Sequence, residues 1–470
     1  MKDLEKKLLK QNKNCWEQWN ENTKKNAFSF AEKYKLFLNS AKTEREVVKE
    51  SIKIAETNGF VNIKKIKSLR PGSKVYAINR ERSLFLARLG RDKLQNGVNL
   101  IMSHIDSPRL DFKVSPLYED ENIAFFKTHY YGGIKKYQWP TIALALHGTI
   151  YLKNGKKCDI VIGEDDDDPI FMITDLLPHL DREGGPGTKI RGRDVKGEDL
   201  NLVVASMPIK DKKIKERVKL FVLNYLYEKY GIKEEDLSSA DLEAVPSEKA
   251  RDLGFDRSMI SAYGHDDRIC AYASLKALFD AKQFTKTQIC ILIDREEIGS
   301  DGNTSAKSIF LEIFISDLLK LSGKKGSLDE VYRVFSSSHG ISADVTAAVD
   351  PDYKDVHDLR NACRLGYGLA IEKYTGSGGK YFTSEASGRF LAKLKSIFSS
   401  NKNIIYQISG GLGKVDQGGG GTIAKYMANR NIEMVDAGVA LLNMHAPLEI
   451  ASKADLYSAY LAYKEFFIKA

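Results

Sequence analysis

The C-terminal half of this 470-residue sequence alternates between helix-like and strand-like segments, and this alternation restricts the fold more than any other feature. Residues 270–278 have the pattern of a helix, and residues 288–293 form a short apolar run typical of a buried strand. A second helix is predicted at 306–322 and a second strand at 330–336. Strands connected through helices pair in parallel, so the sequence predicts an α/β fold with a mostly parallel sheet and helices on both faces.

The N-terminal region extends the same pattern. The first sixty residues predict helices, with an apolar face that includes Phe30, Tyr34 and Phe37. Strand-like runs follow at residues 74–78, 83–87 and 99–102, and the last of these is an apolar run that leads to His104. A run of this kind is typical of a central strand that is buried on both faces.

The middle third of the chain has a different character. Residues 141–146 and 149–152 predict β structure, and Asn154-Gly155 predicts a hairpin turn before a strand at 158–162. We therefore predict a catalytic α/β domain formed by residues 1–109 and 246–470, into which a mainly β domain of residues 110–245 is inserted.

Composition excludes several classes of protein. The 72 basic and 63 acidic residues give a formal charge of +9, but no basic block predicts nucleic-acid binding. No apolar run reaches the roughly 18 residues of a membrane helix, and the first residues do not resemble a signal peptide. The five cysteines are dispersed without a C-x-x-C pair, which favours reduced thiols. We expect a cytoplasmic protein without membrane or nucleic-acid partners.

Five short segments carry histidine or carboxylate side chains at the ends of apolar runs or close to them. They are SHIDSP at 103–108, GHDDR at 264–268, DREEIG at 294–299, SAD at 342–344 and NMHAP at 443–447. The carboxyl ends of parallel strands share one edge of a sheet, and ligands of open α/β sheets bind outside that edge. We therefore expect side chains from these segments to converge there.

The residue types in these segments suit a catalytic metal site. Imidazole nitrogen and carboxylate oxygen are the usual ligands of catalytic zinc, and one carboxylate can bridge two ions. A bound metal lowers the pKa of water towards about 7, and a carboxylate that binds no metal can then take and return a proton. The adjacent Glu296 and Glu297 offer both roles, one as a ligand and one as the base.

Each segment also has a simpler interpretation. His104 and His445 could be ordinary core histidines, and Asp266 could cap a helix. Glu296 and Glu297 could form a solvated surface. The joint occurrence of all five segments in a chain with only eight histidines favours the metal site.

The ordered motifs HIDSP, DDR, DREEIGS, SADVTAAVDPDY and the late MH resemble the aspartyl aminopeptidase family, which includes vacuolar aminopeptidase I. The resemblance runs from about residue 20 to about residue 465. It implies a dinuclear zinc aminopeptidase that acts on peptides, although such sites also accept manganese or cobalt. The resemblance further implies a homo-oligomer, which in the family is a tetrahedral dodecamer, and an oligomerisation role for the inserted domain.

The resemblance also implies roles for individual residues. Glu296 matches the general base, and Asp106 matches a residue that accepts a hydrogen bond from His104 and orients it. His179 matches a position that reaches into the active site of a neighbouring subunit. The spacing alone leaves open whether Asp266 or Asp267 bridges the metals, and the family alignment favours Asp266. The matching metal ligands are His104, Asp266, Glu297, Asp344 and His445.

The sequence departs from the aspartyl branch of the family close to the expected substrate. Ala347 stands where that branch has a histidine, and the late motif is NMHAP in place of Ser-Met-His-Ser. These differences leave the preferred N-terminal residue open between acidic and neutral or apolar. Lys373 and Lys380 are candidates to bind an acidic substrate side chain, although lysines in glycine-rich loops are commonly only solvated.

The sequence thus predicts a metalloaminopeptidase that hydrolyses the N-terminal peptide bond of peptides. A deacylase or carboxypeptidase with two metal ions is the main alternative, and a non-catalytic binding protein with the same fold is a second. The glycine-rich stretch at 410–421 fits no phosphate-binding motif, so we interpret it as a loop.

Overall fold

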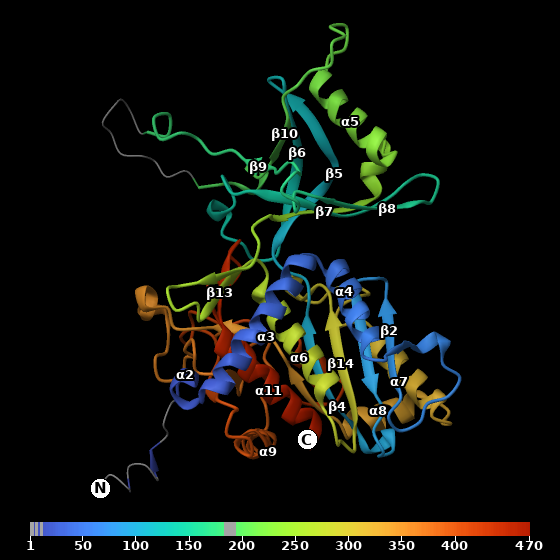
Figure 1. Ribbon diagram of the computed structural model, residues 1–470, viewed down its shortest axis with the longest axis vertical. Coiled ribbons are helices and arrows are strands. Elements are labelled where there is room, and N and C mark those ends of the chain that lie inside the picture. Colours follow the sequence, from blue (N-terminus) through green and yellow to red (C-terminus); the bar gives the residue numbers. More distant parts are fainter. Residues whose placement is uncertain (1–3, 5–7, 10–12, 183–193) are drawn as a thin grey trace. The chain divides into compact units, whose positions relative to one another are not determined.

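The structure is a computed structural model that describes residues 4, 8–9, 13–182 and 194–470. Its backbone divides into two compact units, shown in Figure 1. The first unit consists of Met1–Asp106, Ala250–Met444 and Glu449–Ala470, and the second of Ser107–Lys249 and His445–Leu448. The first unit contains both the predicted α/β rhythm and most of the predicted site residues.

A nine-stranded sheet with the order β1-β2-β3-β14-β4-β15-β19-β17-β18 forms the centre of the first unit. Its middle strands β14, β4, β15 and β19 are parallel, whereas β3 and β17 run antiparallel to the strands beside them in the middle of the sheet. The sheet is therefore mixed, with a parallel centre. The strands are β1 (Val61–Asn62), β2 (Lys74–Asn79), β3 (Ser83–Arg88), β4 (Val98–His104), β14 (Thr287–Ile293), β15 (His339–Ser342), β17 (Leu369–Glu372), β18 (Tyr406–Ser409) and β19 (Glu433–Gly438).

Alternate side chains of these strands enter two separate hydrophobic cores. Ile101 of β4 and Leu292 of β14 belong to one core, and their neighbours Leu100 and Ile291 belong to the other. Because successive side chains of a strand point to opposite faces, each face of the sheet carries its own core. The first core includes α3 (Glu21–Ser40), α4 (Glu44–Thr57), α6 (His265–Asp280), α9 (Gly388–Ser399) and α11 (Lys453–Lys469), and the second includes α7 (Phe310–Leu321), α8 (Leu328–Ser336) and α10 (Ala424–Ala428).

The predicted strand at residues 330–336 is wrong, because this segment is helix α8. Ser327 and Glu330 form a capping box at its start, and Val331, Val334 and Phe335 are buried at helical spacing. The strand comes next, as β15. The two β segments predicted at 141–146 and 149–152 are instead one strand, β7 (Leu144–Tyr151).

A smaller five-stranded sheet also belongs to the first unit, with the order β12-β13-β21-β20-β16. The pairs β12–β13, β13–β21 and β21–β20 are antiparallel, whereas the pair β20–β16 is parallel. The strands are β12 (Arg251–Leu253), β13 (Met259–Ala262), β16 (Thr346–Ala347), β20 (Ala440–Leu442) and β21 (Glu449–Ser452). A short helix, α2 (Cys15–Gln18), precedes α3.

The second unit is built on a seven-stranded antiparallel sheet with the order β8-β7-β11-β5-β6-β10-β9. The predicted hairpin joins β7 and β8, with Tyr151 opposite Lys157 across the turn. Helix α5 (Arg217–Tyr230) packs on this sheet through Val218, Val222 and Leu226. The other strands are β5 (Arg109–Asp120), β6 (Ile123–Tyr131), β8 (Lys157–Ile162), β9 (Met172–Ile173), β10 (Leu202–Ala205) and β11 (Ala240–Pro246).

No helix in the part of the chain that the structure describes has the length and apolar character needed to cross a membrane.

Candidate active site

The carboxyl ends of the parallel strands β14, β4 and β15 meet at one edge of the nine-stranded sheet. His104 is the last residue of β4 and pairs with Ile293 at the end of β14, and Ser342 at the end of β15 pairs with Met102. The next residues of these three chains therefore leave the sheet side by side. This topology brings segments that are far apart in sequence to one place, as expected for an open α/β sheet.

His104 lies at the centre of a buried polar cluster. Its Nε2 is 3.0 Å from Oδ1 of Asp266 and 3.6 Å from Oδ1 of Asp344. Its Nδ1 lies 3.0 Å from the backbone carbonyl oxygen of Asp106, which can only accept a hydrogen bond. The Nδ1 nitrogen therefore carries a hydrogen, and Nε2 faces the two aspartates.

The donor set of this cluster fits a divalent cation. One ligand atom from each of His104, Asp266 and Asp344 lies within 4.8 Å of the others. Burial lowers the pKa of His104, but hydrogen bonds to Asp106, Asp266 and Asp344 outweigh burial and raise that pKa well above its usual range. The carboxylates thus favour a positive charge at this position. A zinc ion supplies that charge and accepts these nitrogen and oxygen ligands.

Asp266, and not Asp267, contributes to the cluster. Asp266 is the second residue of α6, and the helix begins directly after Gly264, whose φ of 72° is a left-handed conformation that favours glycine. The backbone N–H of Asp266 donates to Oε2 of Glu449 at 3.0 Å. The sequence did not suggest Glu449, because this buried carboxylate on β21 acts through a contact 183 positions away.

Glu296 and Glu297 form the 3₁₀ turn η6 (Glu296–Ile298), which follows β14. The carboxylate of Asp106 accepts hydrogen bonds from both backbone N–H groups, at 3.1 Å from Glu296 and 3.2 Å from Glu297. Asp106 was expected to accept from His104. Its backbone oxygen does so, its carboxylate Oδ1 lies 3.4 Å from the same nitrogen, and the carboxylate also holds the two glutamates.

The two glutamates face the cluster differently. Burial and the nearby charge of Asp344 raise the pKa of Glu296 to about 8. A carboxylate oxygen of Glu297 lies within 4.8 Å of one from Asp266, and the two residues belong to a second group of side chains that could hold a metal ion. The pair thus combines a proton-accepting group and a ligand in adjacent residues.

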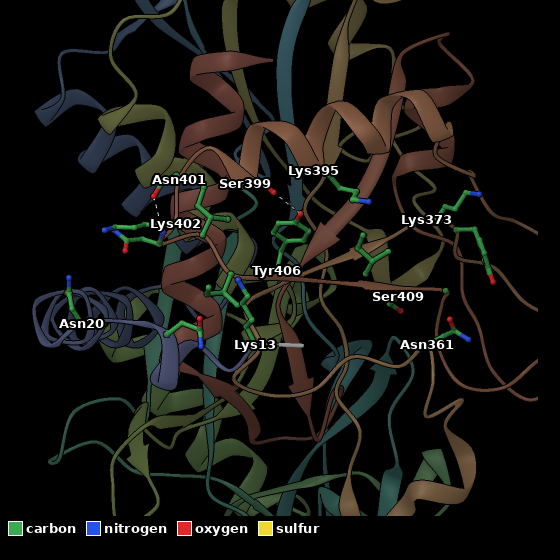
Figure 2. Close-up of a pocket in the computed structure, with 17 residues that line it drawn as sticks. Lys13, Asn20, Asn361, Lys373, Lys395, Ser399, Asn401, Lys402, Tyr406 and Ser409 are labelled. Atoms are coloured by element: carbon green, nitrogen blue, oxygen red, sulfur yellow. Dashed lines mark hydrogen bonds between the residues drawn. The ribbon is translucent and has the colours of Figure 1, made fainter. Parts of the chain in front are cut away.

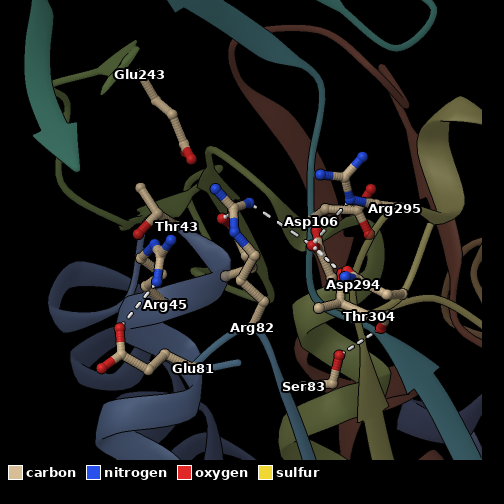
Figure 3. A network of polar contacts seen from close by, with 12 residues as sticks. Thr43, Arg45, Glu81, Arg82, Ser83, Asp106, Glu243, Asp294, Arg295 and Thr304 are labelled. Carbon is tan, nitrogen blue, oxygen red and sulfur yellow. Dashed lines mark hydrogen bonds and ion pairs between the residues drawn. The ribbon is translucent and has the colours of Figure 1, made fainter. Parts of the chain in front are cut away.

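A polar network anchors the segment that carries η6 (Figure 3). The hydroxyl of Thr304 donates to the buried carboxylate of Asp294 at 2.8 Å, and Arg82 pairs with the same carboxylate at 3.6 Å. The hydroxyl of Ser83 on β3 donates to the carbonyl oxygen of Thr304. These contacts connect both ends of the segment 294–304 to Arg82 and Ser83 at the start of β3, which restricts how far Glu296 and Glu297 can move.

His445 lies in the loop between β20 and β21 and is grouped with the second unit. Its Nδ1 is 2.8 Å from the carbonyl oxygen of Gly133, so this nitrogen is the donor. His445 was expected to follow an apolar run that ends at the same sheet edge as the other segments. The strand before it is instead β20, which belongs to the five-stranded sheet.

The remaining predicted residues lie outside the cluster around His104. His179 is exposed in a turn of the second unit. The ammonium groups of Lys373 and Lys380 lie 3.7 and 3.0 Å from the carboxylate of Glu385. The two lysines therefore share one counter-ion, which leaves one positive charge in excess at this place.

The chain matches known proteins over nearly its whole length. Residues 37–467 match the model of the aminopeptidase I zinc metalloprotease family, M18. The probable M18 family aminopeptidase 1 of Thermotoga maritima is 48% identical over 451 residues, which cover 96% of this chain and 98% of that protein. A crystal structure of an M18 family aminopeptidase from T. maritima superposes with a TM-score of 0.93 at 47% identity, covering 98% of this chain and all of that one.

A more distant likeness concerns the fold alone. The S. cerevisiae mApe1 dodecamer has a TM-score of 0.73 at 21% identity and covers 93% of this chain and 96% of that one. Together with the family match over residues 37–467, the T. maritima relatives show that the chain belongs to the M18 family and is a zinc metalloaminopeptidase.

Proposed function

We propose that the chain removes single residues from the N-termini of peptides by means of two zinc ions bound at the edge of the nine-stranded sheet. The observation that carries this proposal is the meeting of His104, Asp266 and Asp344 beside Glu296 and Glu297. Zinc ions bound there would polarise the scissile carbonyl group and lower the pKa of water.

The proposed ligands divide into two sets that share one residue. His104 and Asp344 would hold the first ion, and Glu297 and His445 would hold the second. Asp266 would serve both ions, since its carboxylate is close to His104 and Asp344 as well as to Glu297. The hydrogen bond between His445 and Gly133 supports the role of His445, because it leaves Nε2 available to a metal.

Glu296 is the proposed general base. It is adjacent to the ligand Glu297, and Asp106 holds its backbone in place. In this position its carboxylate takes a proton from the attacking water and returns it to the leaving amine. The same residue thus serves both halves of the hydrolysis.

A substrate panel tests this function against the related hydrolases. The protein should hydrolyse peptides with a free N-terminal amine and their C-amidated forms at similar rates, and should not hydrolyse N-acetylated peptides. An aminopeptidase needs the free amine, whereas a carboxypeptidase needs the free carboxylate. Cleavage of the N-acetylated peptides would exclude the aminopeptidase mechanism, and loss of activity on C-amidated peptides would indicate a carboxypeptidase.

Replacing Asp106 with asparagine is expected to lower kcat/KM by about 10- to 100-fold, as for other residues that orient metal ligands. The asparagine has one oxygen for the two N–H groups of Glu296 and Glu297 and brings an amide donor against them. Anilide kinetics together with zinc analysis would measure the effect. Asp111→Asn is a suitable control, because Asp111 is a half-exposed aspartate of β5. Equal effects of the two substitutions would contradict a positioning role.

The preferred N-terminal residue is the least constrained part of the proposal. Lys373 and Lys380 remain candidate substrate contacts. Both pair with the single carboxylate of Glu385, so one of their two positive charges is not neutralised by it. If they bind an acidic side chain, Lys373→Gln and Lys380→Gln should lower kcat/KM for aspartyl anilide more than for leucyl anilide. A screen of aminoacyl anilides on the wild type and both variants would decide this.

We further propose that the protein is cytoplasmic and forms a homo-oligomer. The oligomerisation domain would be the second unit, whose main segment, Ser107–Lys249, nearly coincides with the predicted insertion at 110–245. The dodecamer of the S. cerevisiae relative supports the homo-oligomer. The five free cysteines support a reducing compartment such as the cytoplasm. His179 is proposed to reach the active site of a neighbouring subunit. Light scattering would measure the assembly, and His179→Ala should lower kcat without changing zinc content or oligomeric state.

A further inference from the structure

A groove of about 940 Å³ follows strand β18 at the end of the nine-stranded sheet (Figure 2). It is lined by Tyr406 and Ile408 of β18, by α9, and by the segment that precedes α3. The hydroxyl groups of Tyr406 and Ser399 lie 3.1 Å apart and connect β18 to α9. The volume falls within the range of about 300–1,000 Å³ that is typical of ligand sites.

The backbone of β18 turns one edge towards this groove. Leu369 and Lys373, at the two ends of β17, donate to the carbonyl oxygens of Ile405 and Ser409. Since the direction of backbone groups alternates along a strand, Tyr406 and Ile408 point their N–H and C=O groups away from β17. In the sheet order, β18 is a terminal strand. No residue that the structure describes pairs with these backbone groups, so within the described part of the chain they form an edge to which another strand could add.

The charge of the groove has one sign. Its lining contains four lysines, namely Lys13, Lys373, Lys395 and Lys402, and no carboxylate. Lys13, Lys395 and Lys402 are exposed and form no ion pair with any residue that the structure describes. Side-chain amides, including those of Asn20 and Asn361, add further polar groups. A ligand for this groove should be acidic and able to accept and donate backbone hydrogen bonds.

We propose that this groove binds an extended, acidic peptide segment of a partner protein, which adds as a strand to the free edge of β18. Backbone hydrogen bonds supply affinity in this mode of binding, and alternate side chains supply specificity. The carboxylates of the partner peptide pair with the lysines of the groove. The same lysines repel peptides that carry basic side chains, which adds to specificity. The lining of the groove contains none of the proposed metal ligands and not Glu296, so this proposal does not depend on the catalytic mechanism; it shares only Lys373 with the candidate substrate contacts.

Edge lysines also have a purely protective use, because they prevent strands of other molecules from pairing with a sheet. A small polyanion such as a phosphate compound would match the lysines without using the backbone edge. The two alternatives differ from the proposal in one property. Only a peptide strand requires both the positive charge and the outward N–H groups of β18.

The direct test measures binding of a labelled peptide to the full-length protein by fluorescence anisotropy. The probe is an N-acetylated, C-amidated nonapeptide in which glutamate alternates with valine, so that it cannot be hydrolysed from its N-terminus. It should bind, whereas the same peptide with lysine in place of glutamate should not. A version that is N-methylated on alternate residues keeps the charge but loses backbone donors, and should bind at least about tenfold more weakly.

Protein variants separate charge from backbone. The double variant Lys395→Glu and Lys402→Glu should weaken peptide binding by about tenfold or more, and the control Lys282→Glu, an exposed lysine after α6, should not. Ile408→Pro removes an outward N–H and spares the ladder with β17, so it should weaken binding by a similar factor. Its melting temperature and leucyl-anilide hydrolysis would show that it is folded.

Three outcomes would overturn the proposal. Absence of binding of the glutamate peptide would leave the lysines with only a protective role. Equal binding of the N-methylated and unmodified peptides would show an electrostatic site that ignores the backbone edge. Displacement of the peptide by inorganic tripolyphosphate, together with unchanged peptide binding by Ile408→Pro, would assign the groove to small anions.

Discussion

Replacing Glu296 with glutamine is expected to lower kcat by about 10²- to 10⁴-fold and to leave the zinc content unchanged. Glutamine keeps the size of the side chain but cannot take a proton from water or return it to the leaving amine. The backbone of η6 should stay in place, because its hydrogen bonds to Asp106 come from N–H groups that the substitution does not touch. Steady-state kinetics on leucyl anilide and metal analysis by mass spectrometry would measure both quantities.

A matched control for this substitution is Glu433→Gln. Glu433 is an exposed glutamate at the start of β19, which is the opposite end of the strand from the edge where the site lies. It should retain wild-type kcat and zinc content. Full activity of Glu296→Gln would remove Glu296 from the mechanism, and loss of zinc from this variant would assign it as a ligand.

The strands that position the site were predictable because they are buried on both faces. In β4 and β14 every residue is buried and each strand contains an apolar run of at least three residues, which is the pattern of a central strand, and both predicted strands lie within the observed ones. The helix α8 was not recognised because its residues Val331, Val334 and Phe335 also have high strand propensity. The capping box at Ser327 was the signal that could have corrected the prediction.

The site was predictable to the extent that ligand-type residues follow such strands. The rule about strand ends applies to His104 and to Glu296 and Glu297, and the structure places them at the same edge of the sheet. It fails for His445, which follows a strand of a different sheet. For Asp266 the sequence had no strand to rely on, and only the family resemblance distinguished it from Asp267.

Contacts that depend on how a loop folds were not predictable from any local pattern. Glu449 accepts from the backbone of Asp266, and Glu385 neutralises part of the charge of Lys373 and Lys380. Both glutamates stand in sequence contexts that also suit ordinary solvated residues. Their partners become apparent only when the chain is folded, because each contact depends on the path of a loop.

Replacing Asp266 with asparagine is expected to reduce the bound zinc from about two ions per chain to below one, with activity falling by at least about 10⁴-fold. Its carboxylate lies within 4.8 Å of ligand atoms of His104 and Asp344, and also of one from Glu297. It is thus the one residue of the proposed set that both ions share. An asparagine offers a single neutral oxygen, which cannot bridge two cations.

The neighbouring Asp267→Asn variant makes this a test of assignment as well as of function. Asp267 is as buried as Asp266 and adjacent in sequence, but its oxygens are not part of the ligand cluster. The two substitutions make the same chemical change one residue apart, so general damage to the fold should affect both. If Asp266 bridges the ions, only Asp266→Asn loses zinc by mass spectrometry. Loss of zinc from Asp267→Asn alone would transfer the bridging role to Asp267 and would require a different path for the chain at the start of α6.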